Sequence, residues 1–131
     1  MFVSRFMQSP KISHWKVSKR ILRYIFGTID YGLFYTHSEN CSLSGYTDSN
    51  YVGSLHDHKS TSSYAFHLGT NLISWASKKQ SIVSISSAEA KYVAANSSAC
   101  QVVWLRRLLK DFSNIQKERT PIYCDKKSCF P

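Results

Sequence analysis

The sequence predicts an α/β fold with a mixed sheet, and three observations carry this prediction. Apolar residues recur with helical spacing near the N-terminus and again after residue 86, which predicts two helices. Between these segments the apolar residues alternate, which is typical of antiparallel strands. A short apolar run near residue 122 predicts one more strand after the second helix. A meander followed by a helix and a further strand is typical of a mixed α/β sheet.

The N-terminal helix is expected over residues 11–28 and to end at Gly27, a residue type that often follows the last helical turn. Its apolar face is formed by Trp15, Val17, Ile21, Leu22, Ile25 and Phe26. The opposite face carries Lys16, Arg20 and Arg23. Such a basic face is either simply solvated or a contact surface for phosphates.

Three or four strands are expected in the middle of the chain, with at least three of them antiparallel. The alternating segments 31–37, 43–53, 63–69 and 72–80 have strand-like composition. Gly69, Thr70 and Asn71 are turn formers, so the last two of these strands are expected to form an antiparallel hairpin.

The second helix is expected over residues 86–112, and the last strand over residues 121–125. The helix has a wide apolar stripe, formed by Ala90, Val93, Ala94, Cys100, Gln101, Trp104, Leu105 and Leu108. Small residues at its start would permit close packing on a sheet. Trp75 and Trp104 are interpreted as core residues in preference to stacking partners of nucleobases.

The composition favours a polyanionic partner. The 131 residues suit one domain, and 43% hydrophobic residues suffice for a packed core. Seventeen Lys and Arg stand against eight Asp and Glu, a net charge of +9, which points to nucleic acid or, alternatively, only to a soluble basic surface. No apolar run approaches the ~20 residues of a membrane span, so no membrane partner is expected.

The cysteine pattern indicates an intracellular protein, cytoplasmic or nuclear. The four cysteines form no CxxC pair and are interpreted as free thiols: Cys41, Cys100, Cys124 and Cys129. Residues 1–5 become charged too early for a signal peptide, so secretion is not expected. A zinc module of His56, His58, Cys124 and Cys129 is an alternative, but its H-x-H and C-x4-C spacings fit the usual structural zinc sites poorly.

Three of the eight acidic residues stand in unusual places. Asp48 lies within a predicted strand, Glu89 in the first turn of the second helix, and Asp125 at the end of the last strand. Taken singly, Asp48 could cap a turn, Glu89 could complete a capping box with Ser86, and Asp125 could begin a polar tail.

Taken together, the three carboxylates can converge at one edge of the sheet. Clustered carboxylates repel one another unless a cation joins them, and oxygen ligands suit Mg²⁺ or Mn²⁺. Two such ions about 3.5–4 Å apart can activate a water and stabilise the leaving oxygen of a phosphodiester. The basic surface would then hold a nucleic acid, and the acidic cluster would hold the metals that cut it.

Several motifs in register carry a family resemblance. They are "GYTDSNYVGS", "DHKSTSSYAFHLG", "ISWASKKQ", "SSAEAKYVA", "WLRRLL" and "IYCD". With them the chain resembles the ribonuclease H domain at the end of the Pol polyprotein of copia-type LTR retrotransposons. Residues 1–36 resemble the end of the reverse transcriptase and its connection, and residues 37–131 the ribonuclease H domain.

This resemblance implies a ribonuclease H-like fold and an endonuclease that hydrolyses the RNA strand of an RNA–DNA hybrid. The family's catalytic, metal-binding carboxylates fall on Asp48, Glu89 and Asp125, with two Mg²⁺ or Mn²⁺ ions expected. Hybrid contacts are expected, less specifically, from Lys59, Ser60, Thr61, Lys78 and Lys79. The reverse transcriptase portion of the polyprotein is an expected partner.

The family pattern continues beyond "IYCD" and includes a fourth acidic residue, whereas nothing acidic follows Asp125 here. The resemblance therefore implies a C-terminally truncated domain, and a chain truncated at both ends. A second metal site that lacks one carboxylate binds its ion more weakly, so weak or absent nuclease activity is expected from this chain alone. The alternative function is a non-catalytic, basic nucleic-acid-binding remnant, whose binding would weaken with salt.

Overall fold

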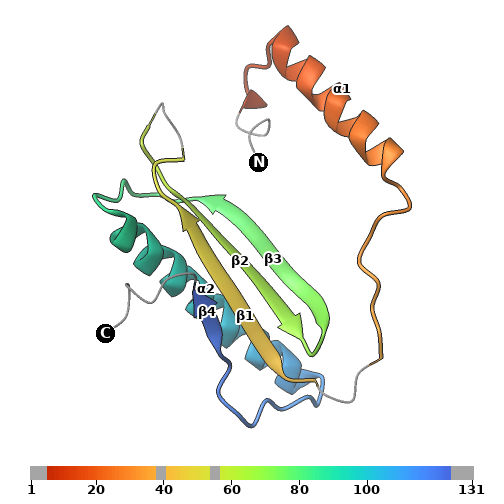
Figure 1. The fold of residues 1–131 in the computed structure, drawn as a ribbon, viewed down its shortest axis with the longest axis vertical. Helices are drawn as coiled ribbons and strands as arrows, with labels where there is room; N and C mark the ends of the chain where they lie inside the picture. Colours follow the sequence, from red (N-terminus) through yellow and green to blue (C-terminus); the bar gives the residue numbers. More distant parts are fainter. Residues whose placement is uncertain (1–5, 38–40, 54–56, 125–131) are drawn as a thin grey trace. The chain divides into compact units, whose positions relative to one another are not determined.

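The computed structural model describes residues 6–37, 41–53 and 57–124. Its elements are α1 (Ile12–Gly27), β1 (Leu43–Asn50), β2 (Thr61–Leu68), β3 (Asn71–Lys79), α2 (Ser87–Asp111) and β4 (Ile122–Cys124). The chain forms two compact units, Met1–Phe34 and Tyr35–Pro131. The first contains α1, and the second contains the sheet and α2 (Figure 1). The assignment of residues 1–36 to the end of a reverse transcriptase stays a prediction.

The second unit has an α/β fold, as predicted, in which helix α2 and a sheet form two packed layers. Its four-stranded sheet has the order β3-β2-β1-β4 (Figure 1). β1 pairs antiparallel with β2, β2 pairs antiparallel with β3, and β4 lies parallel to β1. The predicted hairpin is confirmed: β2 ends at Leu68, β3 begins at Asn71, and Gly69 between them has a φ of 60°, a left-handed conformation that glycine adopts without strain.

Helix α2 packs against β1, β2 and β4, and the core lies between the helix and this face of the sheet. The core is formed by Leu43, Phe66, Val102, Leu105 and Leu109. Small residues in the first half of α2 permit close approach to the strands, since Ala90, Ala94 and Ser98 are buried. Ser98 Oγ lies 2.8 Å from Thr47 Oγ1, so the buried hydroxyls of α2 and β1 satisfy each other.

The predicted apolar stripe of α2 is partly wrong. Cys100 and Trp104 are exposed, whereas the buried stripe continues through Ser98, Val102 and Leu109. The buried stripe therefore runs along a neighbouring line of the helix surface. Ala90, Ala94 and Leu105 of the predicted stripe are buried. The prediction missed Ser98, because a small hydroxyl residue enters a tightly packed interface when its hydroxyl is bonded.

The predicted core role of the two tryptophans is also wrong. Trp75 is 61% exposed and Trp104 is 53% exposed. The pairing of Ala65 with both Tyr46 and Trp75 places these three residues on one face of the sheet. This is the face opposite α2, and in the described part of the chain it leaves Tyr46 and Trp75 half exposed or more.

Residues 31–37, predicted as a strand, form no strand. Side chains replace the expected ladder of backbone hydrogen bonds. Thr36 N donates to Asn71 Oδ1 at 3.0 Å, and Asn71 Nδ2 donates to Thr36 O at 2.8 Å. Tyr35 Oη donates to Leu72 O at 2.9 Å. Tyr35 and Thr36 therefore lie beside the start of β3, but the backbone polar groups of Thr36 bond an amide side chain in place of a neighbouring strand.

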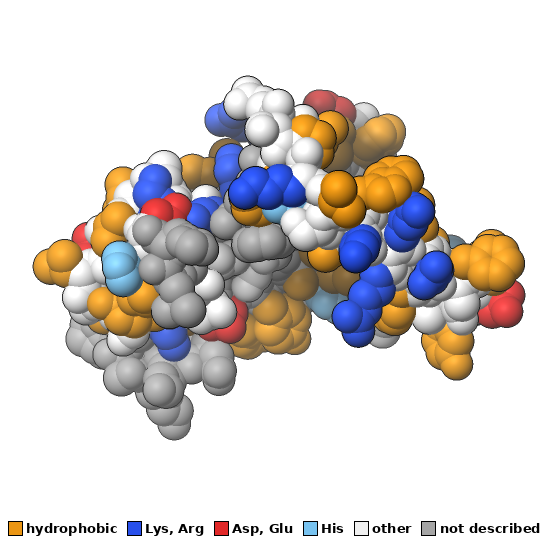
Figure 2. Space-filling model, turned by 90° about the horizontal axis from the view of Figure 1, so that it is seen from above, with side chains coloured by type: hydrophobic (Ala, Val, Ile, Leu, Met, Phe, Trp, Pro, Cys, Tyr) orange, Lys and Arg blue, Asp and Glu red, His pale blue; other side chains and the backbone are white. Residues whose placement is uncertain are grey.

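Helix α1 is confirmed as a basic amphipathic helix. It ends at Gly27, although this residue belongs to the last turn and Thr28 caps it through a 2.8 Å hydrogen bond from Oγ1 to Tyr24 O. None of its residues is buried, and Trp15 and Phe26 are 59% and 82% exposed. Lys19 Nζ lies 5.2 Å from the centre of the Trp15 ring. Exposed hydrophobic and basic side chains also lie side by side on the surface in Figure 2.

Among the described residues, neither α1 nor α2 combines the length and the apolar character that a membrane-spanning helix requires.

Gly45 is expected to be essential for the packing of β1 on β2. A Cβ atom at this position would lie 2.3 Å from Cε1 of Phe66, whose side chain is completely buried in the core. We expect Gly45→Ala to lower the free energy of unfolding by about 1–3 kcal/mol, measured by urea denaturation. Gly53→Ala is the control, because Gly53 is exposed and the nearest atom to an added Cβ belongs to the Asn50 side chain. Equal stability of the two variants would contradict the prediction.

Candidate active site

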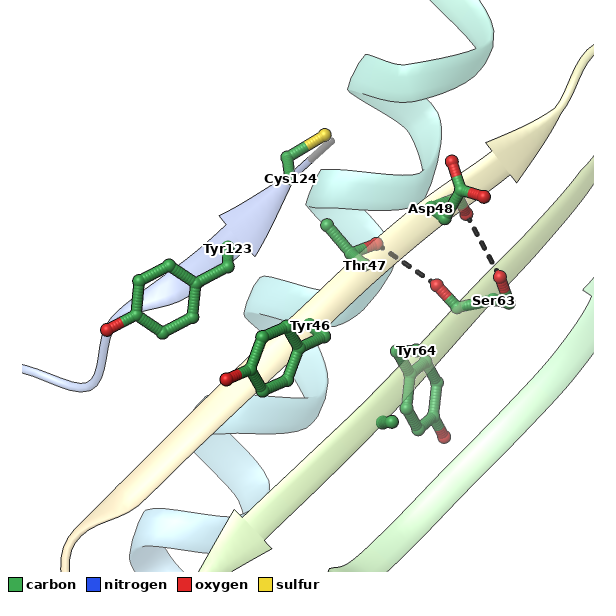
Figure 3. A pocket seen from close by; sticks show the side chains of 8 residues that line it. Tyr46, Thr47, Asp48, Ser63, Tyr64, Tyr123 and Cys124 are labelled. Atoms are coloured by element: carbon green, nitrogen blue, oxygen red, sulfur yellow. Dashed lines mark hydrogen bonds between the residues drawn. The ribbon is translucent and has the colours of Figure 1, made fainter. Parts of the chain in front are cut away.

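Asp48 lies near the C-terminal end of β1 and is exposed. Its neighbour Thr47 is buried against α2, so the alternation of the strand directs Asp48 to the opposite face. Asp48 Oδ1 accepts a 2.7 Å hydrogen bond from Ser49 N, and Oδ2 accepts none from the described residues. Ser63 Oγ donates to the carbonyl oxygen of Asp48 at 3.4 Å (Figure 3). The carboxylate is therefore oriented by the backbone N–H of the next residue, and its Oδ2 remains available for a ligand.

Glu89 lies in the first turn of α2 and is half-buried. The N-cap Ser86 accepts a 3.1 Å hydrogen bond from Glu89 N through its side chain. In a capping box, the Glu89 carboxylate would bond Ser86 N, but Glu89 Oε2 instead accepts a 2.6 Å hydrogen bond from Ile85 N. The local cap thus explains Ser86 and one oxygen of Glu89, and Oε1 accepts no hydrogen bond from the described residues.

The two carboxylates lie at the same end of the sheet and helix layer. The C-terminal end of β1 and the start of α2 meet there (Figure 1). Ile85 connects Glu89 with Tyr51, because its N–H bonds Glu89 and its carbonyl oxygen accepts a 3.2 Å hydrogen bond from Tyr51 Oη. Tyr51 follows Asp48 by three residues. Hydrogen bonds through one residue therefore join the segment after Asp48 to Glu89.

Asp125, the third predicted carboxylate, lies outside the described residues. The last described residue of β4 is Cys124, which pairs with Thr47 of β1 in the parallel ladder. In the sequence, each of these two paired residues immediately precedes a predicted carboxylate. Within the described ranges there is no group of three His, Cys, Asp or Glu residues arranged to hold a metal ion. The three-carboxylate site therefore stays a prediction, although the oxygen donors of Asp48 and Glu89 suit Mg²⁺ or Mn²⁺.

A pocket of about 470 Å³ opens beside Asp48 on the face of the sheet opposite α2. It is lined by Tyr46, Thr47, Asp48, Ser63, Tyr64, Ala65, Tyr123 and Cys124 (Figure 3). The rings of Tyr46 and Tyr123 stack with 5.1 Å between their centres. The sequence interpretation did not single out these tyrosines, yet a signal existed: "YTD" and "YCD" each place a tyrosine two residues before a predicted carboxylate.

Two of the lysines predicted to contact a hybrid are held by internal partners. Lys59 Nζ donates to Ser81 O at 2.6 Å, which ties the loop before β2 to the loop after β3. Lys79 Nζ forms a salt bridge with Asp57. The positive charges of the two lysines remain at this end of the sheet, but both ammonium groups also bond neighbouring loops of the protein.

The other predicted contacts differ in accessibility. Ser60 is completely buried, and its Oγ accepts a 3.2 Å hydrogen bond from Val52 N, so its side chain organises the loop. Thr61 is half-buried at the start of β2. Lys78 is exposed and lines a pocket together with residues of α2. A nucleic-acid contact by any of these residues stays a prediction.

The cysteines in the described part of the chain form no disulfide bond, as predicted: Cys41, Cys100 and Cys124. Cys129 lies outside the described residues. Of the four residues of the alternative zinc module, only His58 and Cys124 are described.

Comparison with known proteins decides the family. The chain is 40% identical over 126 residues to the retrovirus-related Pol polyprotein from transposon TNT 1-94 of Nicotiana tabacum, covering 96% of the chain. It is likewise 40% identical over 124 residues to that from transposon RE2 of Arabidopsis thaliana, covering 94%. The chain belongs to the family of Pol polyproteins of copia-type retrotransposons. The predicted resemblance to copia-type Pol polyproteins is thereby confirmed.

The chain spans only a small part of these Pol polyproteins, 9% of the length of the first and 8% of the second. A further relative is of similar size. Secreted RxLR effector protein 161 of Plasmopara viticola is 40% identical over 103 residues, which is 79% of the chain and 72% of that protein. No protein-family profile matches the chain, and no solved structure matches it. The Pol family thus rests on sequence identity, and the α/β architecture rests on the structure described above.

Proposed function

We propose that this segment of Pol is a ribonuclease H-like domain that hydrolyses the RNA strand of an RNA–DNA hybrid. One observation carries the proposal: Asp48 and Glu89, from distant parts of the sequence, lie at the same end of the layer, and Ile85 joins Glu89 to Tyr51, three residues after Asp48. Each carboxylate has one oxygen oriented by a backbone N–H and a second oxygen that accepts no hydrogen bond from the described residues.

In this mechanism Asp48 and Glu89 would hold a divalent cation, with Asp125 as the predicted third ligand. Bound Mg²⁺ supplies charge that activates a water and stabilises the leaving oxygen of a phosphodiester. The chain's own contribution is orientation. Ser49 N and Ile85 N fix the two carboxylates, which reduces the conformational entropy lost when a ligand binds.

Charge supports a nucleic-acid substrate. The net charge of +9 attracts polyanions, and the lysines and arginines of α1 are exposed. A hybrid would be bound mainly through contacts between its phosphates and basic side chains. The two carboxylates repel a phosphate unless a bound cation lies between them. This division explains why a basic protein keeps two carboxylates at one end of its sheet.

The proposal is tested by cleavage of an RNA–DNA hybrid labelled on the RNA strand. We expect slow cleavage of the hybrid in Mg²⁺ or Mn²⁺, none after addition of EDTA, and none of duplex DNA of the same sequence. Removal of the metal should act reversibly, so that activity returns when Mg²⁺ is added in excess of EDTA. Cleavage that persists in EDTA, or that does not discriminate between hybrid and duplex DNA, would contradict the proposal.

A second candidate function is binding of nucleic acid without catalysis, which the excess of seventeen basic over eight acidic residues favours. It predicts hybrid or duplex binding whose logarithmic affinity falls linearly with the logarithm of salt concentration, without metal-dependent cleavage. Fluorescence anisotropy between 50 and 200 mM salt, roughly the range over which such affinities change most visibly, measures this dependence. Binding without cleavage would favour this function over the first.

A further inference from the structure

Gln80 directly follows β3 and is 5% exposed. Its side chain forms three hydrogen bonds. Nε2 donates to Ser62 Oγ and to Ala90 O, both at 2.8 Å, and Oε1 accepts from Ser84 Oγ at 3.0 Å. Its backbone N also donates to Ser60 O at 2.9 Å. A buried amide is retained in a protein when its polar atoms are bonded in this way.

The partners of this amide come from three separate segments. Ser62 belongs to β2, Ser84 to the loop between β3 and α2, and Ala90 to the first turn of α2. One side chain therefore joins the sheet, the loop and the helix start. Two of these partners adjoin the Glu89 carboxylate and its hydrogen-bond donor in the sequence: Ala90 is next to Glu89, and Ser84 is next to Ile85.

The connection to Glu89 is short on both sides. Ala90 follows Glu89 directly, and Ser84 precedes Ile85, whose N–H holds Glu89 Oε2. The amide of Gln80 thus fixes the residue after the carboxylate and the residue before its hydrogen-bond donor. The Ser86 hydroxyl also holds Glu89, through its backbone N–H, but it acts from within the same segment and does not join the helix start to the sheet.

We propose that Gln80 is a positioning residue, which holds the 80–86 loop and the first turn of α2 so that the Glu89 carboxylate keeps its bond to Ile85 N. For the nuclease site this inference rests on the proposed function. Its structural half, the control of Glu89 by Gln80, does not.

The structural half is tested by amide hydrogen exchange, followed by NMR, in the full chain. Gln80→Met keeps the volume of the side chain and removes its three hydrogen bonds. We expect the amides of Ile85 and Glu89 to exchange about tenfold faster or more in this variant, relative to amides in the middle of α2. The Ile85 amide proton should also shift upfield as its bond to the carboxylate is lost.

Ser98→Ala is the matched control, because Ser98 is buried in the same helix and bonds Thr47 away from Glu89. It should destabilise the layer without selective change at Ile85. If Gln80→Met does not fold, Ser84→Ala removes one of the three hydrogen bonds and should raise the same exchange rates by a smaller factor. Unchanged exchange at Ile85, or an equal change in Ser98→Ala, would overturn the proposal.

The catalytic half is read separately by steady-state cleavage of the hybrid. Gln80→Met should lower kcat and raise the Mg²⁺ concentration needed for half-maximal rate, with KM for the hybrid unchanged. An unchanged kcat and Mg²⁺ requirement would overturn the positioning role for catalysis. If the unmodified chain cleaves nothing, the proposed function fails, and the exchange experiment still decides whether Gln80 positions Glu89.

Discussion

Replacement of Asp48 by asparagine is expected to abolish metal-dependent cleavage of an RNA–DNA hybrid while the fold stays intact. Asparagine has nearly the same shape, and its side-chain oxygen can still accept the hydrogen bond from Ser49 N. The change removes one negative charge, which is what a carboxylate contributes to a Mg²⁺ site. We expect the rate to fall by about 10²-fold or more, equivalent to about 3 kcal/mol of transition-state stabilisation.

Asp30→Asn is the control for this experiment, since Asp30 is an exposed carboxylate in the first unit. It removes the same charge and should leave the cleavage rate unchanged. Circular dichroism and thermal unfolding check that both variants fold like the parent chain. Equal cleavage by the Asp48→Asn variant and the parent would mean that the observed activity comes from a contaminating nuclease.

Replacement of Phe66 by alanine is expected to cost about 3–5 kcal/mol of unfolding free energy, a large share of the stability of a small domain. The side chain of Phe66 is completely buried and belongs to the core cluster with Leu43, Val102, Leu105 and Leu109. Its ring also packs against that of Tyr64, with 5.3 Å between the ring centres. Alanine would leave a cavity between β2 and α2. Urea denaturation measures the loss as a lower midpoint.

Trp75→Ala provides the comparison, because it removes a larger side chain from the open face of the same sheet. Trp75 is 61% exposed, so its removal should change the unfolding free energy by less than about 1 kcal/mol. If Trp75→Ala were as destabilising as Phe66→Ala, the open face would be packed in solution, and the exposed tryptophan would have to be buried by another molecule.

Several elements were predictable because local periodicity decides them. The alternation in β2 and β3, with turn formers at residues 69–71, predicted the hairpin that the structure contains. Ser86 predicted the start of α2, since its hydroxyl can bond an N–H that no helical carbonyl reaches. The parallel strand β4 followed from its position after a crossover helix.

Burial was less predictable, since it depends on contacts between segments that are far apart in the sequence. Trp75 and Trp104 are of a residue type that is usually buried, yet both lie on surfaces that no described residue covers fully. Polar residues such as Ser and Gln are usually exposed, yet Ser60, Ser98 and Gln80 are buried. Other segments supply hydrogen-bond partners for their polar atoms. These partners cannot be predicted from the local sequence around each polar residue.

The sequence by itself determined the order of the observed helices and strands, apart from the strand-like residues 31–37. It also indicated the Pol family and the candidate carboxylates Asp48, Glu89 and Asp125, because motifs and periodicity are local properties of the chain. Tertiary structure decided the rest. It brought Asp48 and Glu89 to one end of the layer, joined Glu89 to Tyr51 through Ile85, and buried Gln80 beside the start of α2. These relations arise only when strands and helix pack, since each depends on hydrogen bonds between residues of different segments.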